Sequence, residues 1–179
     1  MSKFSNFNSP EYIVLKQAFE KMPMMDTYIA NIVEEYIYST VKEYYEDGSL
    51  KCEYRTKYGE KDGEYKEWHD NGQLAIQTTY VDGKLHGEYK EWYDNGKLYE
   101  QTTYVDYEIH GEYKRLWNNG QLYEQTTYVD GNLNGEYKEW RYNGQIYEQI
   151  TYVDGKRQGN YKTWDNEGNL MEWINPIEV

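Results

Sequence analysis

Residues 63–86 read GEYKEWHDNGQLAIQTTYVDGKLH, and this stretch determines the architecture of the chain. Two strand-like segments, EYKEWH and QLAIQTTYV, are each followed by a glycine turn, at Asn71-Gly72 and at Asp82-Gly83. Asn-Gly and Asp-Gly are the preferred pairs of two-residue type I′ hairpin turns. Two glycine breaks in 24 residues leave no room for an amphipathic helix. The stretch therefore predicts a β-hairpin that leads directly into the next one.

The same stretch recurs along the chain with a fixed period of 24 residues. The motif G-x-Y-K begins at Gly63, Gly87, Gly111, Gly135 and Gly159. An earlier turn, Asp47-Gly48, predicts a degenerate first unit at residues 42–62. The expected organisation is a helical cap at 1–41, a repeat array at 42–174 with units from 63, 87, 111, 135 and 159, and a tail at 175–179. The predicted fold class is mainly β, a single-layer antiparallel meander of 24-residue hairpins with a short N-terminal α-helical cap.

The turn positions also predict which residues face each other. With Asn71-Gly72 as a two-residue loop, Trp68 opposes Ala75, Tyr65 opposes Thr78 and Gly63 opposes Tyr80. Because 24 is even, each unit presents the same positions to the same face, and tyrosines form columns. The three columns are Tyr65, Tyr89, Tyr113, Tyr137 and Tyr161; Tyr80, Tyr104, Tyr128 and Tyr152; and Tyr99, Tyr123 and Tyr147. Unequal segment lengths between turns, nine residues at 73–81 and eleven at 84–94, predict a bulge or a stagger in each unit.

Composition restricts the partners that the chain can have. The 179 residues include 32 acidic and 19 basic side chains, a formal charge of −13, together with 23 Tyr and 6 Trp. Such an acidic surface repels phosphate backbones and anionic lipids, so we expect neither nucleic-acid binding nor membrane docking. A single cysteine, Cys52, cannot form an internal disulfide, and no apolar run reaches the length of a membrane span. Without a recognisable signal peptide, the expected location is cytoplasmic, in the host cytoplasm if the protein is viral.

The repeated unit G-x-Y-K-x-W-x-x-N-G-Q-L-Y-E-Q-T-T-Y-V-D-G-K-L-H resembles the MORN repeat over about residues 42–174. It is most similar to a variant found in bacterial proteins labelled antitoxins and in giant DNA viruses. The resemblance implies an elongated single-layer sheet that serves as an interaction platform, often dimerising through one end. Two departures stand out: Leu116-Trp117 replaces Trp and the following residue of other units, and Tyr107 replaces a turn glycine.

The first forty residues follow a different pattern. Ser9 and Pro10 are typical of a helix start, and Pro23 ends that helix. Asp26 would cap a second helix whose apolar stripe is Ile29, Ile32, Val33, Tyr36, Ile37 and Val41. These helices are expected to cover the first edge of the sheet, since repeat arrays need caps. Alternatively they form a docking pair, because Met22-Pro23 before an amphipathic helix resembles the start of an F-box.

The sequence offers little support for catalysis, and we expect no catalytic residues, metal or cofactor. His86 and His110 occupy equivalent positions two strands apart, about 9.6 Å, which is wide for one zinc ion. The register places Glu91 opposite Glu100, Glu139 opposite Glu148 and Arg115 opposite Glu124. Facing carboxylates destabilise a sheet. They are interpreted as exposed side chains that turn towards nearby lysines and arginines, with a cation site or an acid–base pair as the alternative.

The expected function is a non-enzymatic protein-protein interaction scaffold that displays an aromatic, acidic surface. The candidate binding residues are Trp92, Tyr99, Tyr123, Trp140 and Tyr147. The alternatives are binding of a carbohydrate or a quaternary amine on the Tyr and Trp columns, and an antitoxin-like or F-box-like adaptor role.

The C-terminal edge of the sheet is a second candidate contact. The segment carrying Met171, Trp173 and Ile174 is more apolar than the equivalent segments of other units. An open sheet edge favours pairing with another chain. These residues are expected to form either a cap or a homodimer contact with the partner of a two-fold dimer.

Overall fold

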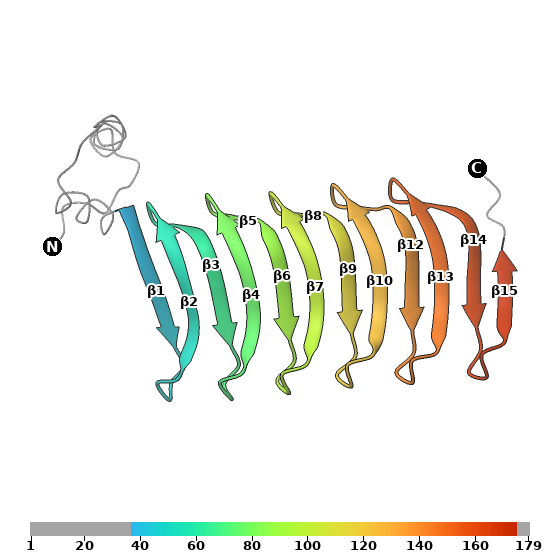
Figure 1. The fold of residues 1–179 in the computed structure, drawn as a ribbon, viewed down its shortest axis with the longest axis horizontal. Helices are drawn as coiled ribbons and strands as arrows, with labels where there is room; N and C mark the ends of the chain where they lie inside the picture. Colours follow the sequence, from blue (N-terminus) through green and yellow to red (C-terminus); the bar gives the residue numbers. More distant parts are fainter. Residues whose placement is uncertain (1–36, 175–179) are drawn as a thin grey trace.

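The computed structural model describes residues 37–174, which form one continuous antiparallel sheet. Neighbouring strands follow sequence order from one end of the sheet to the other, as predicted for a meander (Figure 1). The strands are β1 (Tyr38–Tyr44), β2 (Leu50–Lys57), β3 (Glu60–Trp68), β4 (Leu74–Val81), β5 (Lys84–Leu85), β6 (Gly87–Trp92), β7 (Leu98–Val105), β8 (Glu108–Ile109), β9 (Gly111–Leu116), β10 (Leu122–Val129), β11 (Asn132–Leu133), β12 (Gly135–Trp140), β13 (Ile146–Val153), β14 (Lys156–Trp164) and β15 (Leu170–Ile174).

The predicted bulge occurs once in each unit, between the short strand and the long strand that follows it. In the first complete unit, Tyr80 pairs with Leu85 while Ile76 pairs with Glu91, so the later segment has two extra residues. Gly87 lies in this irregularity with φ of +90°, a left-handed conformation that glycine adopts without a Cβ clash. The bulge absorbs the difference in segment length and keeps every unit in the same register.

The two kinds of glycine turn differ from each other. At Asp82-Gly83 both residues have positive φ, 46° and 79°, which confirms the predicted type I′ turn. The Asn71-Gly72 prediction was wrong. The loop contains three residues, Asp70 to Gly72, and the Gly72 amide donates to the His69 carbonyl at 2.9 Å. This is the type I turn followed by a left-handed glycine that three-residue hairpin loops favour.

The longer loop changes the pairing beside it. Trp68 pairs with Leu74 rather than with Ala75, which becomes the extra residue of a bulge. Further from the loop, Tyr65 pairs with Thr78 and Gly63 with Tyr80, as predicted. The register error is therefore confined to the end of the hairpin nearest the turn.

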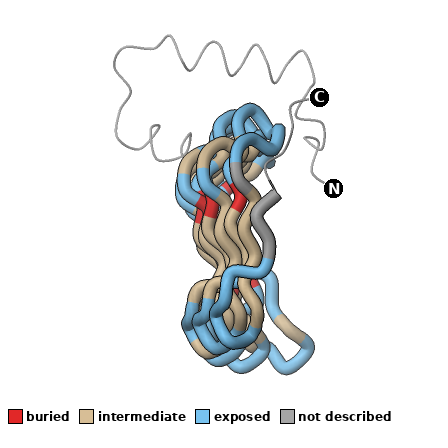
Figure 2. The backbone as a smooth tube through the Cα atoms, turned by 90° about the vertical axis from the view of Figure 1, so that its right-hand side faces the viewer, coloured by how far each residue is buried: buried red, intermediate tan, exposed pale blue. Residues whose placement is uncertain are grey.

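No second layer covers the described sheet, so its core lies within a single layer (Figure 2). Thr78, Thr102, Thr126 and Ile150 form the most buried column, each at most 3% exposed. The rings of Tyr65 and Tyr80 lie 5.8 Å apart beside Gly63, and this edge-to-face pair recurs in the following units. These paired tyrosine rings thus supply aromatic packing on one face of the described sheet, which has no second layer.

Side chains on one rim connect each unit to the next. The residue directly after each of β1, β3, β6, β9 and β12 contacts a backbone carbonyl 23 residues later through its side chain. The donors are Tyr45, Tyr93, Trp117 and Arg141, and His69 Nε2 makes the equivalent contact. Trp117 Nε1, for example, lies 3.1 Å from the Trp140 carbonyl oxygen. The departure at Leu116-Trp117 therefore preserves the contact, because tyrosine, tryptophan and arginine all carry a donor at the required distance.

The N-terminal end of the array differs from the sequence prediction in one respect. Strand β1 begins at Tyr38 and contains Val41, which corrects both the helix predicted to extend through Val41 and the array boundary at residue 42. Tyr38 pairs with Lys57, so backbone pairing with β2 overrides the helical apolar period here. The remaining cap residues 1–36, including Ser9, Pro10 and Met22-Pro23, and the tail 175–179 lie outside the described residues.

Candidate functional site: a row of glutamates among tyrosines

A continuous row of eleven paired residues, seven of them glutamates, crosses the sheet on one face. Directly paired residues share a face of an antiparallel sheet, and here the pairing continues from strand to strand across the unit boundaries. We call these residues the glutamate row. In order from β1 to β14 they are Glu43, Cys52, Glu67, Ile76, Glu91, Glu100, Arg115, Glu124, Glu139, Glu148 and Thr163.

The tyrosine columns border this row and donate hydrogen bonds to its carboxylates. Tyr89 donates to Glu91 at 2.9 Å, and Tyr113 donates to Glu100 at 2.8 Å. The same contact recurs between Tyr65 and Glu67, Tyr137 and Glu139, and Tyr161 and Glu148. Burial, followed by these carboxylates, raises the pKa of Tyr89 far above its ordinary value. The hydroxyls therefore act as neutral donors, which leaves the negative charge of the row in place.

One cation lies inside the glutamate row. Arg115 is placed between Glu100 and Glu124, with guanidinium nitrogens 3.5 Å and 3.7 Å from their carboxylate oxygens. Its Cζ atom also lies 5.5 Å, 5.8 Å and 6.0 Å from the ring centres of Tyr99, Tyr113 and Tyr123. Two carboxylates and three aromatic rings thus surround one guanidinium, an arrangement that favours a delocalised planar cation.

The carboxylates beyond Arg115 are less well compensated. Burial raises the pKa of Glu124, and the nearby Glu139 adds to this rise while Arg115 opposes it. Burial also raises the pKa of Glu139, and Glu148 adds to it, whereas Tyr137 and Arg141 act in the opposite direction. Three adjacent carboxylates at this end of the row therefore repel one another in a partly desolvated setting.

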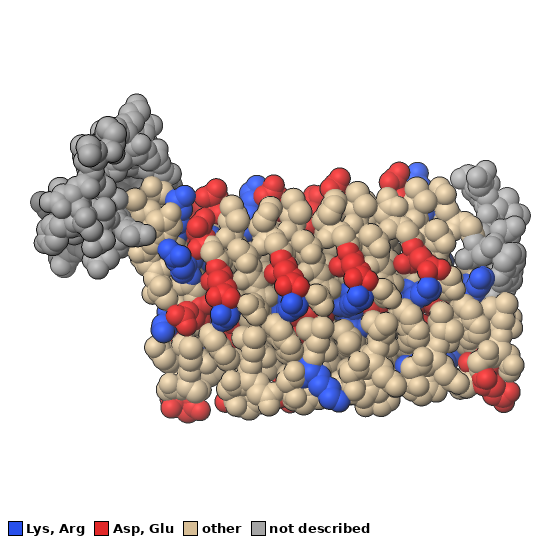
Figure 3. Space-filling view, viewed as in Figure 1, with Lys and Arg blue, Asp and Glu red and all other residues tan. Residues whose placement is uncertain are grey.

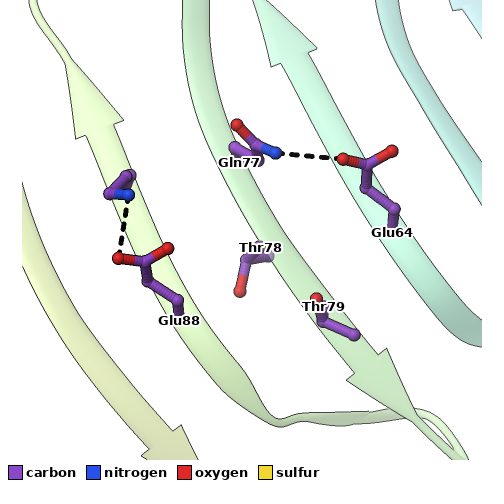
Figure 4. Close-up of a pocket in the computed structure, with 6 residues that line it drawn as sticks. Glu64, Gln77, Thr78, Thr79 and Glu88 are labelled. Atoms are coloured by element: carbon purple, nitrogen blue, oxygen red, sulfur yellow. Dashed lines mark hydrogen bonds and ion pairs between the residues drawn. The ribbon is translucent and has the colours of Figure 1, made fainter.

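The opposite face carries glutamates whose charge is neutralised locally. Lys66, Lys90, Lys114 and Lys138 each pair with the glutamate two residues earlier, at 2.6 to 2.8 Å. Acidic and basic side chains lie next to each other in a row across the strands in Figure 3. In a shallow hollow on β4, Gln77 donates to Glu64 while Lys90 contacts Glu88, so both carboxylates have partners (Figure 4).

A protein-family model for the MORN repeat variant matches five tandem segments of the chain, at residues 39–58, 61–82, 85–106, 109–130 and 133–154. These segments make up more than half of the sequence. The chain belongs to the MORN repeat variant family. Its hairpin units are MORN repeats, and the resemblance seen in the sequence is confirmed at the level of the family and its sheet of hairpins.

Comparisons beyond the family model add little. No curated protein matches this MORN-repeat chain. Among solved structures, a mutant of S. aureus TarM in complex with fondaparinux, alpha-GlcNAc-glycerol and UDP is similar with a TM-score of 0.35 and 12% identity over 82% of this chain. A second TarM structure gives a TM-score of 0.34 and 12% identity over 79%. The MORN chain spans about a quarter of TarM, 27% and 25% respectively.

The predicted binding residues of the MORN array separate into two groups. Tyr99 and Tyr123 lie against Arg115, and Tyr147 lies 4.5 Å from Arg141 Cζ. Trp92 and Trp140 lie half-buried at strand ends, where their carbonyls accept the rim hydrogen bonds. Tyr99 and Tyr123 make their ring contacts with Tyr93 and Trp117 instead. The structure therefore brings Tyr99 and Tyr123 to Arg115 in the glutamate row, places Tyr147 against Arg141, and leaves the two tryptophans at the rim.

The facing glutamates were placed correctly by the sequence, and Glu100 and Glu124 do turn towards an arginine, Arg115, but the expected exposure and the expected lysine partners were wrong. Glu91 pairs with Glu100, Glu139 with Glu148, and Glu124 with Arg115. The side chains of Glu100 and Glu124 are only 13% and 14% exposed, and the four lysines pair with glutamates of the other face. Because lysine and the row glutamates differ by an odd number of residues along the strand, they point to opposite faces.

Other predicted features have simple positions in the MORN array. His110 Nδ1 lies 3.3 Å from the Asp130 carboxylate at the surface. Within residues 37–174, no group of three or more His, Cys, Asp and Glu side chains is placed to hold a metal ion. The part of the chain that the structure describes contains no helix long and apolar enough to span a membrane. Met171 is 67% exposed on β15, where the backbones of Trp173 and Ile174 pair with β14 and their side chains lie outside the described part.

Proposed function

We propose that this MORN-repeat chain is a non-enzymatic protein-interaction scaffold that uses its tyrosine–glutamate face to bind a protein partner. One observation carries the proposal: the two faces hold glutamates in opposite states. On the lysine-bearing face, the paired glutamate side chains are 45 to 55% exposed. On the tyrosine face, the side chains of Glu100 and Glu124 are 13% and 14% exposed, and the two carboxylates share one arginine, Arg115.

Uncompensated charge on a partly desolvated surface favours a partner of opposite charge. The glutamate row places carboxylates on β1, β3, β6, β7, β10, β12 and β13, with neighbouring strands about 4.8 Å apart. Tyrosine supplies large contact areas at low conformational cost, which is why it is enriched in interface hot spots. Complementary charge further increases the association rate and orients the partner. A protein with a basic, extended surface suits such a row, whereas a nucleic acid would be repelled by it.

A matched pair of variants tests which face binds. Glu91→Gln/Glu148→Gln removes two charges from the glutamate row, and Glu88→Gln/Glu136→Gln removes two from the other face without changing side-chain size. The proposal predicts that partners captured from an extract of the source cells are retained by wild type and by Glu88→Gln/Glu136→Gln, and are lost from Glu91→Gln/Glu148→Gln. Loss of the captured partners from Glu88→Gln/Glu136→Gln alone, or their equal retention by all three proteins, would contradict the proposal.

The C-terminal edge supports a second contact, with another copy of this chain. Strand β15 is the last strand of the described sheet, and Leu170 and Met171 on it are 51% and 67% exposed. Unpaired backbone groups at such an edge accept a further strand. We therefore propose a two-fold dimer through β15, which light scattering detects as a doubled mass that Met171→Asp reduces to the monomer. A monomer at high micromolar concentration would contradict the dimer.

A further inference from the structure

We infer that the carboxylates of Glu124, Glu139 and Glu148, together with the rings around them, form a binding site for an arginine guanidinium supplied by the partner protein. This inference rests on the proposed function and specifies the chemistry of the partner. The site lies on β10, β12 and β13, one unit beyond the chain's own Arg115. Arg115 shows how this surface holds a guanidinium, since it is bound there already.

Every group that contacts Arg115 recurs 24 residues later. The two carboxylates of Glu100 and Glu124 are repeated as Glu124 and Glu148. The three rings are repeated one unit later as well: Tyr99, Tyr113 and Tyr123 correspond to Tyr123, Tyr137 and Tyr147. The complete set of five is present around position 139, whereas the unit before Arg115 has Ala75 and Ile76 in place of one ring and one carboxylate.

The central residue is what differs between the two positions. Arg115 pairs with Glu124 across the strands, and the equivalent residue Glu139 pairs with Glu148. The types of group that surround the Arg115 guanidinium thus recur around a third carboxylate, that of Glu139, in the next unit. Burial and Glu148 raise the pKa of Glu139, and the rise prevails over the opposite effects of Tyr137 and Arg141, which supports a local excess of negative charge. A cation arriving from outside would relieve this excess, as Arg115 does from inside the chain.

Arg141 does not fill the site. It occupies the place that Trp117 has in the preceding unit, and its Nη2 atom donates to the Trp164 carbonyl at the rim. In the filled unit, Tyr123 contacts both Trp117, at 4.4 Å between ring centres, and Arg115. The corresponding ring, Tyr147, contacts Arg141 on one side and is 37% exposed, so it can contact a second group.

A guanidinium suits these carboxylates and tyrosine rings better than an ammonium does. It is planar, stacks on aromatic rings, and can donate to two carboxylates at once. An ammonium is a compact and strongly hydrated charge that gains less from the rings. The site therefore predicts a preference for arginine over lysine at equal net charge.

The test uses a capped hexa-arginine peptide as the probe, with capped hexa-lysine and tetramethylammonium chloride as comparison ligands. Calorimetry on the wild-type chain should show hexa-arginine binding more tightly than hexa-lysine at physiological salt. Glu139→Arg places the chain's own guanidinium in the site, and it should weaken hexa-arginine binding by about tenfold or more. The same variant should raise the melting temperature, because it repeats the Arg115 arrangement.

Glu136→Arg is the matched control, with the same change of charge three residues away on the other face. It should leave hexa-arginine affinity within about threefold of wild type, since distant surface charges are screened. It should also lower the melting temperature slightly, because Glu136 loses its pair with Lys138. Equal loss of affinity in both variants, equal binding of hexa-lysine, or tighter binding of tetramethylammonium than of hexa-arginine would each overturn the inference. Face-dependent capture of a partner would then still stand, which separates this failure from failure of the proposed function.

Discussion

The two faces of this sheet use the same residue type for different purposes. On one face, each glutamate lies two residues from a lysine, remains about half exposed and is neutralised within its own strand. On the other face, glutamates lie in one row among tyrosines, and Arg115 pairs with two of them. A repeat protein can thus separate solubility from binding by the parity of residue positions, because successive side chains on a strand alternate between faces.

The largest difference in unfolding free energy between the faces should appear when two neighbouring side chains of β9 are each truncated to alanine. Tyr113 is 5% exposed, contacts the Tyr128 ring at 5.7 Å and donates to Glu100. Tyr113→Ala should therefore cost about 3–5 kcal/mol of unfolding free energy, as expected for a large buried aromatic. Lys114→Ala, one residue along on the other face, should cost less than about 1 kcal/mol. Denaturant unfolding of both variants measures the difference, and equal costs would contradict a structural role confined to the tyrosine face.

A smaller difference is expected between the two kinds of charge pair. Arg115→Met leaves Glu100 and Glu124 without their cation in a mostly buried setting, and should cost about 1–3 kcal/mol. Lys138→Met removes the partner of an exposed glutamate, and should cost less than about 1 kcal/mol. Chemical denaturation at neutral pH tests both values. If Lys138→Met proved the more destabilising variant, the assignment of uncompensated charge to the tyrosine face would be wrong.

The smallest effect concerns pH. Burial raises the pKa of Glu124 and Glu139, so the folded chain holds these protons at a pH where the unfolded chain has lost them. The two carboxyls therefore contribute more to the unfolding free energy as pH falls through their raised pKa values in the folded chain. The contribution is complete once pH lies below the ordinary glutamate pKa of the unfolded chain. On the other face, hydrogen bonds from Lys66 and Lys90 lower the pKa of Glu64 and Glu88, which lose stabilising charge only at lower pH.

The melting temperature should accordingly rise by about 1–3 °C as pH decreases from neutral towards about 5, and fall at more acidic pH. Glu139→Gln should reduce this rise because it removes one of the two responsible carboxyls. The matched Glu136→Gln variant should retain it. A melting temperature that falls steadily from neutral pH in the wild-type chain would show that the row is compensated.

Most of the fold could be predicted from the 24-residue period and its glycines. Even spacing fixes which positions share a face, and the Asp82-Gly83 turn behaves as its sequence indicates. The Asn71-Gly72 turn does not, because Asp70 and Asn71 also suit a type I turn, and only the backbone geometry distinguishes the two loops. Val41 shows a second limit, since an apolar period at the edge of an array fits either a helix or a strand.

The candidate site was only partly predictable. The facing pairs Glu91–Glu100 and Glu139–Glu148 follow from hairpin register within a unit. The contact between Glu124 and Glu139 crosses a unit boundary, where two extra residues in the bulge alter the arithmetic. Without the pairing across unit boundaries, the sequence predicts only isolated pairs. It predicts neither the continuous glutamate row nor the two carboxylates and three rings around Arg115. The hydrogen bond from Tyr113 to Glu100 also joins two units, so it does not follow from the register of a single hairpin.

The most direct test of the account is nuclear magnetic resonance of the tyrosine rings during titration with capped hexa-arginine. With ¹³C-labelled tyrosine, assigned by single Tyr→Phe substitutions, the rings of Tyr123, Tyr137 and Tyr147 should show the largest shifts. The ring of Tyr142, which is 55% exposed at a turn, should change little. Shifts largest at Tyr142, or spread evenly over all columns, would contradict a guanidinium site in the glutamate row.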